Sequence, residues 1–162
     1  MKVILSILFC AFFMVSPPDL THIRKIYGLA SGNTEIIAQL EKELATVSKD
    51  DNKVLVAYKG AVLTMAAKYA KKNSDKKEFF KEGAGLIEFA IASEPENIEI
   101  RTIRLSIQEH APKFLKYHDN ISEDKEFILR HYKNTTSTAV KNFVKLYVMS
   151  SESFSEEDKM IF

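Results

Sequence analysis

The feature that most constrains this 162-residue chain is the spacing of its apolar residues, which recur every three or four positions in successive segments. This period is typical of a helix with one face turned to a core. The clearest segment is 75–93, whose apolar and small positions are Phe79, Phe80, Gly83, Leu86, Ile87, Ala90 and Ile91. The pattern predicts an all-α fold of about seven or eight helices, paired as antiparallel hairpins in an α-solenoid or a helical bundle.

Turn-forming residues are scarce and separate these segments cleanly. Five glycines and four prolines are too few for a β-sandwich or barrel, which needs many short turns. The predicted helices cover 20–30, 34–47, 53–72, 75–93, 98–111, 123–132 and 139–149, with a short helix after Pro112 and a last turn after Ser155. The polar residues expected to cap helix starts are Asp19, Asn33, Asn52, Ser74 and Ser122, and Ser155 with Asp158 is expected to form a capping box. Gly60 interrupts the third helix at a cost of about 1 kcal/mol relative to alanine, so we expect a neighbouring helix to approach closely there.

The segment 98–107 is open to two interpretations. Its β-branched residues and partial alternation are compatible with a strand. As a helix it is apolar on two sides, with Ile100, Ile103 and Ile107 on one side and Ile98 and Leu105 on the other. We favour a helix in a middle layer, because no second strand is available to pair with it.

The N-terminus predicts export. Lys2 precedes an apolar run over 3–15, which is too short to span a bilayer and ends at a polar, proline-containing break. We therefore expect a signal peptide over 1–16 and a single domain over 17–162, with no membrane span after signal removal and a periplasmic or extracellular location. An uncleaved anchor, a buried helix and a lipoprotein signal ending at Cys10 are the alternatives.

Removal of the signal would leave no thiol, which excludes disulfides and cysteine nucleophiles from the mature chain. The formal net charge of +1 predicts no general attraction to nucleic acid or to an anionic membrane.

The segment 83–97 resembles the second helix and exit turn of a tetratricopeptide repeat (TPR). Gly83 and Ala90 stand at the small positions, Ile87 at the large apolar position and Pro95 at the terminal proline. The whole chain resembles a group of small exported bacterial TPR-like proteins of unknown function, through YKGAVLTMAAKYA, EPENIEIRTIRLSIQEHAPKFLKY and SEDKEFI. The resemblance implies helical hairpins and brings no activity or site residues.

No catalytic, phosphate-binding or cofactor motif occurs in the sequence. The four histidines lack the spacing of metal ligands, and we expect neither a metal site nor a cofactor. The carboxylates Glu123, Asp124 and Glu126 could hold a cation, but acids are typical of the first turn of a helix.

The best binding candidates are Arg101, Arg104 and Gln108, which fall within about 60° of one another on a helix. The two guanidinium groups could clamp a carboxylate such as a peptide C-terminus. Alternatively, they could pair inside the protein with acids such as Glu94 or Glu109.

The sequence is compatible with three functional hypotheses. The first is a non-enzymatic cell-envelope protein, a TPR-like module that binds a protein or peptide. The second is an enzyme whose site is assembled from dispersed residues such as Arg101, Arg104, Glu123 and His131. The third is a purely structural component of the envelope.

Overall fold

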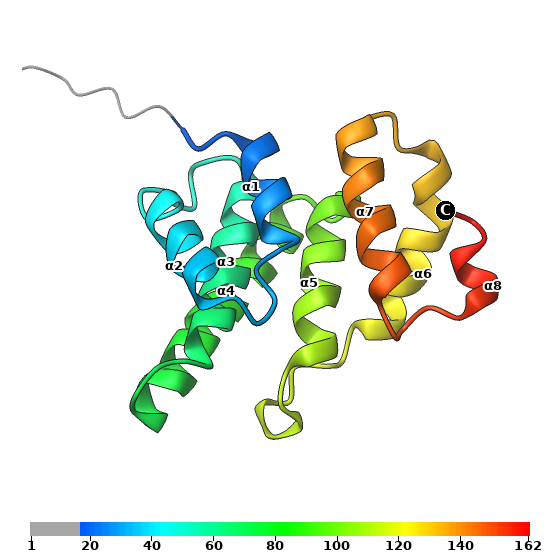
Figure 1. Cartoon of the computed structure of the whole chain (residues 1–162). Helices are drawn as coiled ribbons and strands as arrows, with labels where there is room; N and C mark the ends of the chain where they lie inside the picture. The colour runs from blue at the N-terminus through cyan, green and yellow to red at the C-terminus, as the bar shows by residue number, and fades with distance from the viewer. Residues whose placement is uncertain (1–16) are drawn as a thin grey trace, which may run out of the picture.

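The computed structural model describes residues 17–162 and is shown in Figure 1. Within these residues the chain is all-helical and contains no strand, which confirms the predicted fold class. The predicted signal peptide over 1–16, with Cys10, lies outside the described residues. The helices are α1 (Leu20–Tyr27), α2 (Thr34–Glu43), α3 (Lys53–Ala67), α4 (Asn73–Ser93), α5 (Ile98–His110), α6 (Ile121–His131), α7 (Thr138–Ser150) and α8 (Glu156–Lys159), with 3-10 turns at Lys113–Leu115 and Tyr132–Asn134.

Polar caps begin most of these helices. A capping side chain satisfies backbone N–H groups that lack a partner in the first turn. The side chains that accept such bonds belong to Asp19, Asn33, Asn52, Asn97, Ser137 and Ser155. The predicted capping box at Ser155 is confirmed, with Asp158 as its second member.

Two predicted caps are wrong. Ser74 does not cap α4, because its hydroxyl donates to Asp75 Oδ1 (2.9 Å) and the helix already begins at Asn73. Ser122 does not cap α6, because this helix already begins at Ile121. These shifts move the helix starts without changing the number or order of helices.

The third helix is shorter than predicted. It ends at Ala67, and the next residues continue as single turns in which Lys68, Tyr69 and Ala70 each bond to the carbonyl three positions back. Tyr69, which the periodicity places on the buried stripe, is consequently 43% exposed.

The odd-numbered helices form the centre of the fold. Each of α1, α3 and α5 contacts the next odd-numbered helix, and α1 also contacts α7. The aromatic rings of Tyr27, Tyr58 and Phe143 meet where α1, α3 and α7 converge, with centroids 4.9 to 6.2 Å apart. The face shared by these helices is thus filled by the protein's own side chains.

Helices α3 and α4 cross at a pair of glycines. A Cβ atom on Gly60 would lie only 2.5 Å from the carbonyl oxygen of Gly83, and one on Gly83 would crowd the carbonyl of Gly60 as closely. The predicted close approach at Gly60 is confirmed, and its partner is Gly83 of α4.

Helix α5 is enclosed on all sides. It contacts α3, α4, α6 and α7, and ten of its residues are buried, including both sets of apolar positions. The predicted helical middle layer is confirmed. Because the helix has no solvent face along most of its length, its charged residues are carried into the interior.

Candidate functional site

The charged residues of α5 form three separate clusters with the helices around it. Glu99, Arg101 and Arg104 have exposed fractions of 1%, 7% and 3%, and Glu109 lies in the last turn. Charged groups at such depth require partners, because desolvation is costly.

Asp124 of α6 is the centre of the largest cluster. It is fully buried and accepts from Arg104 through both oxygens, at 2.7 Å from Nε and 2.8 Å from Nη2. Arg101 Nη1 donates to the same carboxylate at 2.9 Å. One buried carboxylate therefore holds two guanidinium groups, the first in a bidentate arrangement.

Further acceptors surround these two arginines. Arg101 also donates to Glu123 (2.6 Å) and to the carbonyl of Pro95 (2.8 Å), and Arg104 donates to Glu88 (3.0 Å). The hydrogen bond from Arg101 is the main reason that the pKa of Glu123 lies below its ordinary value. For Arg104, burial opposes the charged form, but Asp124 and Glu88 outweigh burial and raise its pKa.

Glu88 links this cluster to the connection between α5 and α6. The Tyr117 hydroxyl donates to Glu88 Oε1 at 2.7 Å, so the Glu88 carboxylate bridges Tyr117 and Arg104. Burial, followed by the hydrogen bond to Glu88, raises the pKa of Tyr117. The phenol thus stays neutral and serves as a donor.

The second cluster joins α1, α3 and α5 through Glu99. Arg24 donates to both carboxylate oxygens at 2.7 and 2.9 Å, and the Tyr58 hydroxyl donates to Oε1 at 2.8 Å. Burial and then the Glu99 charge raise the pKa of Tyr58. The cluster fixes α1 against the central layer.

The third cluster ties the end of α5 to the C-terminal part of the chain. Glu109 accepts hydrogen bonds from the hydroxyls of Tyr147 and Ser151 and from the backbone N–H of Ser153. Burial by itself would raise the pKa of Glu109, but these donors overcome it and hold the pKa below the ordinary value.

The structure brings the predicted binding residues Arg101 and Arg104 together and leaves Gln108 apart from them. Gln108 is fully buried; its Nε2 donates weakly to Asn120 Oδ1 (3.4 Å), and its Oε1 has no hydrogen-bond partner among the described residues. The internal acids named from sequence, Glu94 and Glu109, are not the partners of the arginines. Glu94 instead accepts from Asn97 (2.7 Å).

The acids that do pair with the arginines are Glu88, Glu123 and Asp124. The sequence carried a signal for Asp124, because it lies three and four positions before the apolar residues Phe127 and Ile128 and so shares a helix face with them. Nothing comparable marked Glu88, which lies on a different helix and enters the cluster only through tertiary packing.

The residues of the dispersed-enzyme hypothesis converge only in part. Arg101, Arg104 and Glu123 meet around Asp124, whereas the His131 ring stacks on Phe127 with centroids 3.9 Å apart. The guanidinium of Arg101 also lies over Phe127, 4.4 Å from its centroid. In this arrangement the guanidinium groups already hold protein carboxylates, so a ligand carboxylate would have to displace Asp124.

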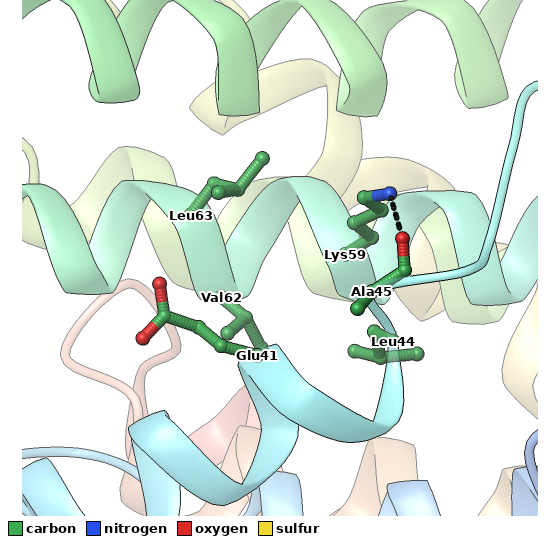
Figure 2. Close-up of a pocket in the computed structure, with 6 residues that line it drawn as sticks. All are labelled: Glu41, Leu44, Ala45, Lys59, Val62 and Leu63. Atoms are coloured by element: carbon green, nitrogen blue, oxygen red, sulfur yellow. Dashed lines mark hydrogen bonds between the residues drawn. The ribbon is translucent and has the colours of Figure 1, made fainter.

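Two hollows on the surface lie away from the three charged clusters. Figure 2 shows one of about 150 Å³ between α2 and α3, lined by Leu44, Val62 and Leu63 with Glu41 beside them. In it Lys59 Nζ donates to the carbonyls of Ala45 (3.0 Å) and Val47 (2.6 Å), which follow α2. This lysine therefore stabilises the C-terminal end of α2.

The second hollow, of about 580 Å³, is lined by Lys49 and by α4 residues from Glu78 to Leu86. Neither hollow includes a residue of the three charged clusters.

Residues 17–162 hold neither a cluster of metal ligands nor a membrane-spanning helix. In this range no three histidine, cysteine or acidic side chains gather where they could hold a metal ion. In the same range no helix is long and apolar enough to cross a membrane.

Comparison of the chain with family models, with curated proteins and with solved structures finds no significant match.

Proposed function

We propose that this chain is a non-enzymatic, exported interaction module of a bacterial cell envelope, which binds a protein or peptide on the outer side of α7. One observation carries the proposal. The interior charges are engaged in contacts within the chain, whereas α7 exposes two large apolar side chains on the side facing solvent.

These two side chains form the α7 ridge, defined as Leu146 and Met149. They are 74% and 50% exposed, and their spacing of three places them on one face of the helix. Val144 and Val148 on the opposite side are fully buried. A helix anchored by one face with an apolar ridge on the other fits a partner that offers an apolar helix or peptide.

The location of the ridge follows from the packing of the interior. The rings of Tyr27, Tyr58 and Phe143 occupy the face shared by α1, α3 and α7. Leu29, which follows α1, is also 59% exposed, and α1 contacts α7. The contact surface is accordingly assigned to the outside of these helices.

Export and the TPR-like character of the module are supported by sequence. The apolar run over 3–15 supports a secretory signal. The resemblance is further supported by Gly83, a small residue at the α3–α4 crossing, and by Pro95, which follows the end of α4.

The test is partner capture from envelope extracts with the full chain and a ridge variant, Leu146→Ser/Met149→Ser. Each side chain at the centre of an interface is worth about 1 kcal/mol or more, so we expect at least a tenfold loss of the captured partner. Quantitative mass spectrometry of the captured proteins measures this loss.

The matched control is Met160→Ser, which removes an apolar side chain that is 80% exposed and lies outside α7. It should capture the partner as well as the unmodified chain does. Failure of the unmodified chain to enrich any protein contradicts the proposed function. Undiminished capture by a folded ridge variant contradicts the assignment of α7.

A further inference from the structure

Two connections between helices lie at the same end of the molecule. In Figure 1 the tip between α3 and α4 and the loop between α5 and α6 both reach the lower edge of the fold. They are joined by an edge-to-face contact between Phe80 and Tyr117, with centroids 5.7 Å apart. We define the lysine–aromatic end as residues 68–82 and 113–119.

This end concentrates positive charge. It holds eight lysines and four acids, a net charge of +4. Residues 17–162 carry 22 basic and 22 acidic side chains, so the remainder of the described chain carries a net charge of −4. The eight lysines are Lys68, Lys71, Lys72, Lys76, Lys77, Lys81, Lys113 and Lys116.

These lysines are available to an external anion. Apart from the half-buried Lys76 they are exposed, and none forms an ion pair within the described part of the chain. By contrast, the buried arginines Arg101 and Arg104 and the partly buried Arg24 are all paired. These arginines are therefore engaged within the protein, whereas the lysines of this end are left to solvent.

Aromatic side chains stand among these lysines. Phe114, Tyr69 and Phe79 are 80%, 43% and 40% exposed. Phe114 lies in the 3-10 turn Lys113–Leu115, which Lys116 closes in a left-handed conformation with φ of 51°. Exposed aromatic rings among lysines are typical of surfaces that bind at the interface of an anionic bilayer.

We propose that the lysine–aromatic end docks on the anionic surface of a phospholipid bilayer. The lysines lie against the lipid phosphates, and Phe114, Tyr69 and Phe79 enter the headgroup region. The apolar rings favour a bilayer over a soluble polyanion, which offers them no apolar phase. The inference is independent of the proposed function, because it uses a different surface from the α7 ridge.

The first test is co-sedimentation of the full chain with vesicles of phosphatidylcholine, with or without phosphatidylglycerol. Binding to neutral vesicles measures the contribution of the apolar run over 3–15, which every variant retains. We expect binding to the anionic vesicles to exceed this baseline and to weaken steeply as salt is added. Each lysine contributes about a fivefold gain in partitioning, so Lys71→Glu/Lys72→Glu should lower it by at least about 25-fold.

The matched control is Lys25→Glu/Lys133→Glu, which changes the net charge equally at exposed lysines outside this end. It should retain partitioning within about fivefold of the unmodified chain. Equal losses in the two variants, or no preference of the unmodified chain for anionic vesicles, overturns the proposal. Circular dichroism and thermal unfolding confirm that each variant is folded.

The second test addresses the aromatic contribution. Phe114→Ser should reduce partitioning about tenfold, whereas Met160→Ser, at an apolar residue that is also 80% exposed but lies outside this end, should not. Unchanged partitioning of Phe114→Ser overturns the insertion of this ring. Tight binding to soluble polyglutamate without binding to anionic vesicles overturns the bilayer as the ligand.

Discussion

Two hairpins of this protein close in opposite ways. The α3–α4 hairpin closes by removing side chains, since Gly60 and Gly83 bring the two backbones into direct contact. The α5–α6 hairpin closes by pairing charges, since Arg101 and Arg104 of α5 bind Asp124 of α6. Both pair neighbouring helices, so helical-hairpin architecture does not dictate the chemistry of the crossing.

The difference shows where each crossing is vulnerable. A glycine contact tolerates no added atom, because backbone on the facing helix cannot move aside easily. An ion-pair crossing tolerates no missing partner, because a guanidinium left alone in the interior loses both solvent and counter-charge.

Asp124→Ala should have the largest effect. It leaves two buried guanidinium groups without their shared acceptor, and we expect a loss of about 3–5 kcal/mol in the free energy of unfolding. Urea denaturation followed by circular dichroism measures this loss. A cost below about 1 kcal/mol would show that the ion pairs do not hold α6 against α5.

A fully apolar replacement sharpens the same comparison. Arg101→Met/Arg104→Met/Asp124→Leu removes the charges together, and such exchanges are often neutral or stabilising. The triple variant should therefore be more stable than Asp124→Ala. If both are equally unstable, packing volume rather than uncompensated charge determines the cost.

Gly83→Ala should have the next largest effect. Its new methyl group would collide with the carbonyl of Gly60, and overpacking of this kind costs about 1–3 kcal/mol or more. The matched control is Gly85→Ala on the same helix, where a Cβ atom meets nothing within 4 Å. This control should gain about 0.5–1 kcal/mol, because alanine is the better helix former. Similar melting temperatures for the two variants would contradict the close crossing.

Glu123→Gln should have the smallest effect. The Glu123 side chain is 55% exposed, so its ion pair with Arg101 is worth at most about 1 kcal/mol at neutral pH. The pKa of Glu123 is lowered in the folded protein, so its contribution is present above the ordinary value of 4.5 and disappears as pH falls through the lowered folded value. Denaturation at pH 7 and at successively lower pH should show the two chains converging in acid. A difference that grows on acidification would contradict this assignment.

Local sequence predicted much of the fold. The apolar period identified the helices, and Asp19, Asn33 and Asn52 marked helix starts through their capping chemistry. Gly60 predicted a close crossing because a glycine inside a helix needs a compensating contact. The predictions at Ser74 and Ser122 were wrong because a hydroxyl near a helix start has several local partners to choose from.

The candidate site was less predictable. The arginine stripe was identified, but its partners were sought at Glu94 and Glu109. Helical spacing locates residues on a face of their own helix and says nothing about which other helix covers that face. Glu88 and Asp124 became partners of Arg104 only when α4 and α6 packed against α5.

By itself, the sequence determined the all-helical class, the positions of most turns and the two-sided burial of α5, because these depend on residues within a few positions of one another. Tertiary structure alone decided which charges pair and where unpaired charge gathers. The formal net charge of +1 does not indicate that the lysine–aromatic end carries a net charge of +4. Net charge is a sum over the chain, whereas an electrostatic surface depends on which charges the packing of helices buries and which it leaves in solvent.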